Sequence, residues 1–240
     1  MIPVPQTAMV MAAGLGSRMR PLTDQTPKPL IDIAGKALLD RALDPLARAG
    51  VKRIVVNVHY LADQVEAHLA KRTDFDVTIS DERGERLETG GALAKARPLL
   101  GDDPIFVVNT DAFWAPEDDS PLLQLAEYFD PADMDSVLLL ADRERTLGFN
   151  GPGDFFLRDN SRVAWRGEAA RSPYAFAGVR IIRPQIFDGE DVRAFSVLEK
   201  WRPLVDAGRL HGVAMDKFWL HVGDPTAKED AEMWMRCHGA

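Results

Sequence analysis

Residues 8–29, AMVMAAGLGSRMRPLTDQTPKP, join a short apolar run to a loop with two glycines and then to a lysine between two prolines. The apolar run at 8–12 predicts a buried first strand. Gly14 and Gly16 follow it, and glycine allows backbone conformations and close approaches that a Cβ would block. A strand that leads into a glycine loop in this way indicates the beginning of an open α/β fold.

Strand-like and helical patterns alternate after this beginning. Leucine and alanine recur at helical spacing over 38–46 and stop before Gly50, and the β-branched run 53–58 then predicts a buried strand. Such alternation predicts a mainly parallel sheet with right-handed crossovers. Further strands are expected at 75–80, 104–108, 136–140, 174–182 and 218–222, and further helices at 65–69, 91–100, 122–129, 196–207 and 226–236.

The pattern changes at 148–153, GFNGPG, which predicts a loop. The short runs 155–157 and 163–165 then predict an antiparallel hairpin. We therefore expect an α/β fold: a Rossmann-like, mainly parallel but mixed sheet, flanked by helices and carrying a small antiparallel hairpin insertion. No linker divides the sequence, so we expect a single domain over 1–240.

Composition narrows the classes of partner. The chain has 240 residues and a formal net charge of -8, which argues against nucleic acid as a partner. Its single cysteine, Cys237, excludes an intrachain disulfide and fits a reducing compartment. No apolar run approaches the roughly 18 residues of a membrane helix. We expect a cytoplasmic protein with no membrane partner.

The loop after the first strand is a candidate phosphate site. Gly14 and Gly16 let successive backbone amides point into one concavity, and Arg18 adds a cation. A simple strand-to-helix turn would use the same glycines. Two better-known loops are excluded, because no Gly-Lys-Ser/Thr is present and Met19 stands where a dinucleotide fingerprint needs its third glycine.

Two later residues add chemistry to this loop. Lys28 lies between Pro27 and Pro29, which restrict the backbone and give the lysine a fixed direction. Asp111 ends the apolar run 107–111, at the strand edge where the glycine loop should also lie, and is a candidate ligand for a divalent ion. The alternatives are a solvated surface lysine and an aspartate that caps the next turn.

The segment Ala12-Ala13-Gly14-x-Gly16-Ser17-Arg18-Met19-x-Pro21-Leu22-Thr23, followed by Pro27-Lys28-Pro29, resembles the signature of the sugar-phosphate nucleotidyltransferases. The resemblance implies a fold of the GT-A-like nucleotidyltransferase type, with a nucleotide-binding part at 1–145 and a sugar-side and C-terminal capping part at 146–240. It implies catalytic roles for Arg18, Lys28 and Asp111, with Asp111 binding Mg²⁺. Its implied triphosphate ligands are Ala13, Gly14, Gly16, Ser17 and Arg18.

The second metal ligand departs from the family pattern. Members supply an aspartate from a Trp-x-Asp-x-Gly-Thr motif, whereas this chain has Trp219-Leu220-His221-Val222-Gly223-Asp224. His221 could face the metal directly or through water, Asp224 could replace it, or Asp111 and the phosphates could hold the ion alone. An imidazole ligand would suit Mn²⁺ better than Mg²⁺.

Glu88-Thr89-Gly90-Gly91 resembles a segment that lies against the base in bacterial uridylyltransferases acting on muramic acid and related sugars. Its two glycines would let a flat base approach the backbone, although Thr89 could simply cap a helix. The strand at 174–182 resembles the sugar-side strand of the family, which makes Gly178, with Asn109, a sugar-pocket candidate.

The resemblance implies an enzyme that joins a sugar 1-phosphate to a nucleoside triphosphate and releases pyrophosphate. N-acetylmuramic acid 1-phosphate and UTP, used in cell-wall recycling, are the expected substrates. Two alternatives are kept: a glucose or mannose 1-phosphate nucleotidyltransferase, and a sensor that binds nucleotide-sugars without chemistry. A monomer or a small homo-oligomer is expected.

Overall fold

The computed structural model describes residues 3–239, which are built around a nine-stranded mixed sheet. Seven strands lie in the order β11-β10-β12-β6-β1-β4-β5, and β8 pairs with β12 and β13. The bounds are β1 (Thr7–Met11), β4 (Arg53–Val58), β5 (Asp76–Asp81), β6 (Ile105–Asn109), β8 (Ser136–Asp142), β10 (Phe155–Leu157), β11 (Val163–Trp165), β12 (Tyr174–Ile182) and β13 (Leu210–Ala214). The predicted fold class is confirmed.

The first part of the sheet is parallel, as the alternation of strands and helices predicts. β1 pairs in parallel with both β4 and β6, and Met11 stands level with Asn57 on one side and Asn109 on the other. The chain segments that leave these three strands therefore emerge at one edge of the sheet. In α/β sheets this carboxyl edge is where ligands bind.

The second part of the sheet is mostly antiparallel. β12 runs antiparallel to both β6 and β8, and β10 and β11 form the predicted hairpin beside it. β13, which sequence patterns miss, is parallel to β8. β12 therefore links the two parts of the chain, because it pairs with β6 and β8, which precede residue 145, and with β10, which follows it.

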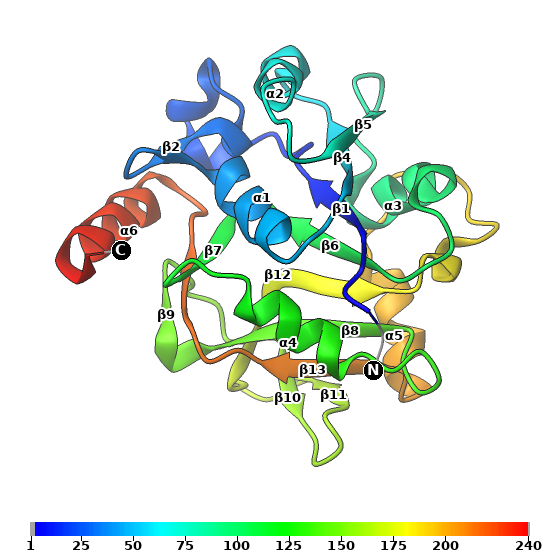
Figure 1. Cartoon of the computed structure of the whole chain (residues 1–240). Coiled ribbons are helices and arrows are strands. Elements are labelled where there is room, and N and C mark those ends of the chain that lie inside the picture. Colours follow the sequence, from blue (N-terminus) through cyan, green and yellow to red (C-terminus); the bar gives the residue numbers. More distant parts are fainter. Residues whose placement is uncertain (1–2, 240) are drawn as a thin grey trace.

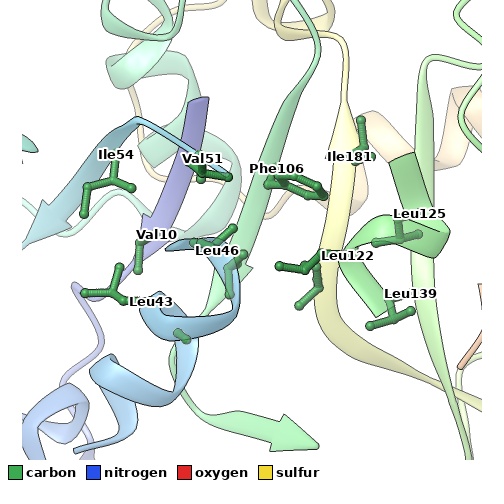
Figure 2. Close-up of a cluster of buried hydrophobic side chains, with 14 of the residues drawn as sticks. Val10, Leu43, Leu46, Val51, Ile54, Phe106, Leu122, Leu125, Leu139 and Ile181 are labelled. Carbon is green, nitrogen blue, oxygen red and sulfur yellow. The ribbon is translucent and has the colours of Figure 1, made fainter. Parts of the chain in front are cut away.

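Helices cover both faces of the sheet (Figure 1). α1 (Leu38–Arg48), α2 (Ala62–Leu69) and α4 (Ser120–Tyr128) bury their apolar sides in one core cluster, and α3 (Glu88–Leu100) and α5 (Leu198–Asp206) bury theirs in another. Figure 2 shows the first cluster, where Leu43 and Leu46 of α1 and Leu122 of α4 face sheet residues such as Phe106. Burial of aliphatic side chains at roughly 25 cal/mol per Å² is the main force that holds these layers together.

A small additional layer lies beside the carboxyl edge. β7 (Ala112–Ala115), β14 (Phe218–His221) and β9 (Thr146–Leu147) form a three-stranded sheet, and β2 (Asp32–Ile33) pairs with β3 (Lys36–Ala37). α6 (Pro225–His238) packs here, beginning at the N-cap Asp224 and ending at Gly239. In β14, His221 is level with Ala112, the residue after Asp111, so this pairing brings the C-terminal motif to the sheet edge.

Most element bounds agree with the sequence patterns to within a few residues. α3 begins at Glu88 rather than Gly91, so the Glu-Thr-Gly-Gly segment lies inside the helix and not before it. β7 and β9 are too short for periodicity to reveal. Among residues 3–239, no helix combines the length and the apolar character that crossing a bilayer requires.

Candidate active site

A cavity of about 450 Å³ lies at the carboxyl edge of β1, β4 and β6. It brings together most of the residues that the sequence singled out, from segments far apart in the chain. Its lining includes Ala13, Gly14, Gly16, Ser17, Arg18, Lys28, Glu88, Thr89, Asn109 and Asp111. His221, Asp224, Gly90 and Gly178 are not part of this lining, and each is placed below.

The glycine loop is held in place by contacts that explain its two glycines differently. Gly16 is in the left-handed region at φ 62°, and a Cβ there would lie 2.8 Å from Cγ2 of Thr23 and 3.0 Å from Cβ of Lys28. The Thr23 hydroxyl donates to the Gly16 carbonyl at 2.8 Å. Gly14 lines the cavity, and a Cβ added there would meet nothing within 4 Å. Gly16 therefore shapes the loop, whereas Gly14 leaves space for a ligand.

The loop also presents unused donors to the cavity. Within the described chain, no protein acceptor takes the N–H groups of residues 13–17, while the Ala12 amide beneath them donates to Oδ1 of Asn57 at 2.7 Å. Backbone N–H groups without partners, next to the Arg18 side chain, are suited to phosphate oxygens. A simple strand-to-helix turn would not need several unpaired amides that face a cavity beside an arginine.

Alanine at these two glycines should have opposite effects. Gly16→Ala should lower the free energy of unfolding by about 1–3 kcal/mol, because it combines an unfavourable φ with a close contact to Thr23. Gly14→Ala should leave stability within about 0.5 kcal/mol but lower kcat/KM for the nucleotide by roughly 10²-fold, because its methyl group displaces the phosphates. Denaturant unfolding and pyrophosphate release measure the two effects. Equal loss of stability in both variants would contradict this division.

Lys28 and Asp111 form an ion pair at the cavity wall. Lys28 Nζ donates to Oδ2 of Asp111 at 3.2 Å, and the lysine side chain is only 12% exposed. Burial alone would raise the pKa of Asp111, but the charges of Lys28, His221 and Arg18 and the lysine hydrogen bond together hold it below its ordinary value. Neither alternative from the sequence is seen: the lysine side chain is mostly buried, and the Asp111 carboxylate accepts no backbone amide of a following turn or helix within residues 3–239.

His221 lies opposite this pair. Its Nε2 is 3.9 Å from Oδ2 of Asp111, and its Nδ1 is 3.2 Å from the carbonyl oxygen of Gly148. In the neutral ring with its proton on Nδ1, as opposed to the charged ring, that proton would be donated to the carbonyl and the Nε2 lone pair would be directed toward the Asp111 side. The carboxylate of Asp224 instead accepts the amide of Ala227 at 2.9 Å and caps α6. The geometry favours His221 over Asp224 as the second ligand.

The Glu-Thr-Gly-Gly segment lies at the start of α3, where Glu88 and Thr89 line the cavity. A Cβ on Gly90 would lie 2.4 Å from the Phe195 ring, and one on Gly91 would lie 1.9 Å from the Arg193 carbonyl oxygen. The Gly90 amide donates to the Phe195 carbonyl at 2.8 Å. These glycines therefore let the segment 193–197 pack closely on α3, which differs from the base contact that the sequence suggested.

Thr89 shares in this packing. Its hydroxyl oxygen accepts the Val197 amide at 3.0 Å, and the residue lies inside α3, whose N-cap position is Leu87. The alternative that Thr89 caps the helix is therefore wrong.

Sequence patterns missed a buried polar network at one end of the cavity. Glu82 is 1% exposed, and its carboxylate accepts Nδ2 of Asn57 at 2.8 Å and the Leu87 amide at 3.2 Å. Burial raises the pKa of Glu82, although these hydrogen bonds oppose the shift. Through Asn57 and its bond to Ala12, the network ties the glycine loop to the start of α3. A single Asn and Glu at strand ends give no motif, so only the alignment of strand ends could have suggested them.

Asn109 and Gly178 meet across β6 and β12. Gly178 is in the left-handed region at φ 87°, and a Cβ there would lie 3.3 Å from Cβ of Asn109. Oδ1 of Asn109 is buried and has no hydrogen-bond partner within residues 3–239. An acceptor left open beside a missing side chain is suited to a hydroxyl or amide N–H of a ligand.

Comparisons with known proteins show which family the chain resembles. The chain is 47% identical over 233 residues to the N-acetylmuramate alpha-1-phosphate uridylyltransferase of Caulobacter vibrioides, covering 95% of this chain and 96% of that protein. It is 37% identical to the enzyme of the same name from Neisseria meningitidis serogroup B, with 94% and 96% covered. The inositol-1-phosphate CTP transferase of T. maritima superposes with a TM-score of 0.77 at 17% identity, covering 96% and 95% of the two chains, which shows a shared fold.

A family model covers the part of the chain that carries the glycine loop and Asp111. The description "Nucleotidyl transferase" matches residues 7–149, which include every cavity-lining residue named above. The chain belongs to the nucleotidyl transferase family and is a sugar-phosphate nucleotidyltransferase.

Proposed function

We propose that this enzyme joins UTP to N-acetylmuramic acid 1-phosphate, giving the nucleotide-sugar and pyrophosphate. The placement of Lys28 and Asp111 3.2 Å apart beside the unused amides of the glycine loop carries the proposal. The choice of UTP and muramic acid is supported by the names of the two relatives that match nearly the whole chain. The unbroken sheet across 1–145 and 146–240 supports one domain in which the two parts hold nucleotide and sugar.

In the proposed reaction a phosphate oxygen of the sugar 1-phosphate attacks the α-phosphate of UTP, and pyrophosphate leaves. The amides of residues 13–17 and the Arg18 guanidinium hold the triphosphate. Lys28 is placed to stabilise the negative charge that grows on the reacting phosphate oxygens. No protein nucleophile is required, because positioning and electrostatic stabilisation supply most of the rate enhancement in such transfers.

The donor set fits a divalent ion that shares its coordination with the substrate. No group of three or more His, Cys, Asp or Glu side chains within residues 3–239 could hold an ion alone. Asp111 and His221 provide one carboxylate and one imidazole, and phosphate oxygens would complete the set, as is usual where Mg²⁺ or Mn²⁺ binds nucleotides. A bound ion would neutralise charge on the phosphates. We propose Mn²⁺ as a better fit than Mg²⁺ because of the imidazole.

Exchange of His221 for aspartate should change the choice of metal. The wild-type protein with nucleotide should bind Mn²⁺ more tightly than Mg²⁺, and His221→Asp should bind Mg²⁺ better by roughly tenfold, because a carboxylate oxygen replaces nitrogen. Titration with Mn²⁺ followed by electron paramagnetic resonance, with Mg²⁺ as competitor, measures this without turnover. Asp224→Asn is the matched control, since asparagine also caps helices. An unchanged Mn²⁺/Mg²⁺ ratio in His221→Asp would exclude His221 as a ligand.

A panel assay tests the proposed function. The protein is incubated with Mg²⁺ or Mn²⁺, each of the four nucleoside triphosphates, and the 1-phosphates of N-acetylmuramic acid, N-acetylglucosamine, glucose and mannose. Release of pyrophosphate should be fastest with UTP and N-acetylmuramic acid 1-phosphate. Faster release with glucose or mannose 1-phosphate would assign a hexose-1-phosphate enzyme. Binding without pyrophosphate release from any pair would identify a sensor.

A further inference from the structure

Arg180, two residues before the end of β12, is a buried cation without a counter-ion in residues 3–239. It is 1% exposed, its Nε and Nη2 atoms have no acceptor, and no carboxylate within residues 3–239 forms an ion pair with it. The guanidinium carbon lies 5.4 Å from the centre of the Trp201 ring and 5.7 Å from that of Phe176. Burial lowers the pKa of Arg180 to about 9, so the side chain is still charged at neutral pH.

The sheet register connects Arg180 to the cavity. Arg180 stands opposite Val107 of β6, and Gly178 is two residues closer to the carboxyl edge, beside Asn109. Because side chains alternate between faces, Arg180 and Asn109 share a face of the sheet. Gly178 has no side chain to separate them. Asn109 lines the cavity, and Arg180, which is not part of the lining, lies on the same face of the sheet just beyond Gly178.

Three side chains on or against this face of the sheet have unused polar atoms. Arg180 and Trp201 offer donors, Nε and Nη2 on the first and Nε1 on the second, while Asn109 offers the acceptor Oδ1. Buried polar groups are normally hydrogen-bonded, and several adjacent exceptions indicate a missing partner. The partner that would satisfy them carries an anionic group and, a short distance away, a hydroxyl or amide N–H.

The energetic cost of burying the Arg180 charge also indicates a missing partner. An unpaired charge in an apolar cluster is strongly unfavourable, and an apolar residue of similar size there is often neutral or stabilising. A cation between Phe176 and Trp201 gains only part of this back through their ring faces. Arg180 therefore breaks a rule of core packing, and such violations concentrate at functional sites.

We infer that Arg180 and Trp201, with Asn109, form a subsite for a carboxylate-bearing substituent of the sugar 1-phosphate. The inference rests on the proposed function and adds the residue that selects the sugar. N-acetylmuramic acid differs from N-acetylglucosamine by a lactyl ether that ends in a carboxylate, so the subsite distinguishes two sugars that are otherwise alike. The acetamido N–H or a ring hydroxyl is suited to Oδ1 of Asn109.

Calorimetric binding of the two sugar 1-phosphates, with no turnover needed, tests the subsite. Wild-type protein should bind N-acetylmuramic acid 1-phosphate more tightly than N-acetylglucosamine 1-phosphate by on the order of 10- to 100-fold, the range of one charged hydrogen-bonded contact. Arg180→Met should abolish this difference by weakening only the carboxylate-bearing sugar, while its Tm is unchanged or higher. Arg180→Lys should keep part of the difference.

A wild-type protein that does not discriminate between the two sugars would overturn the subsite. Equal weakening of both sugars in Arg180→Met, or full discrimination in that variant, would also overturn it and assign Arg180 a structural role. The proposed function fails separately, since it requires pyrophosphate release from UTP with N-acetylmuramic acid 1-phosphate. Arg183→Met is the matched control, because Arg183 follows β12 and pairs with Asp135 at 3.1 Å, away from the cavity lining.

Discussion

Lys28→Ala should lower kcat by about 10²–10³-fold, the loss expected when one preorganised charged donor is removed from a transition state. The lysine is 12% exposed and is held at Nζ by Asp111, so its charge is already in position before the substrate binds. The short turn Lys28–Leu30, with Pro27 before it and Pro29 inside it, fixes the backbone that carries the lysine. A charge fixed in this way costs little reorganisation during the reaction.

Two control variants separate this loss of kcat from a general loss of folding or activity. Lys71→Ala removes an exposed lysine far from the cavity lining and should leave kcat unchanged. Lys28→Arg keeps the charge but not the geometry, so it should recover only part of the rate. Steady-state pyrophosphate release at saturating UTP measures kcat, and denaturant unfolding confirms that each variant folds. A Lys28→Ala enzyme with kcat within about threefold of wild type would remove Lys28 from the proposed chemistry.

Local signals in the sequence were sufficient for much of the fold and for one side of the site. A few consecutive residues are enough to recognise the glycine loop, the lysine between prolines and the aspartate at a strand end. All three line the cavity. The β12 strand and the antiparallel hairpin follow from their apolar patterns, although the direction of β12 relative to β6 and β8 does not. Local periodicity does not specify whether a strand runs parallel or antiparallel to a neighbour far away in the chain.

Features that depend on contacts between distant segments could not be predicted. Glu82 becomes a buried partner of Asn57 only because β4 and β5 end side by side. The glycines at 90 and 91 were assigned to the base, whereas the segment 193–197 fills the space against them. No pattern over a few residues reveals what packs against a helix from a hundred positions away. Arg180 could not be predicted for the same reason. Its lack of hydrogen-bond acceptors follows from the way β12 is buried among distant segments.

Asp111→Asn and Asp224→Ala should separate the proposed first metal ligand from the aspartate that was one alternative for the second. Asp111→Asn keeps the size of the side chain but removes the charge that pairs with Lys28 and faces His221, so metal affinity in the presence of nucleotide should fall about 10–100-fold and kcat by at least 10²-fold. Asp224→Ala removes the cap of α6 and should cost about 1 kcal/mol of stability with kcat retained. Mn²⁺ titration measures metal affinity, pyrophosphate release measures kcat, and denaturant unfolding measures stability, all on the same preparations.

The opposite pattern, with metal binding lost in Asp224→Ala and kept in Asp111→Asn, would move the ion to the start of α6. That outcome would conflict with the geometry, because the Asp224 carboxylate already accepts the Ala227 amide, whereas the Asp111 carboxylate faces the cavity where the phosphates must lie.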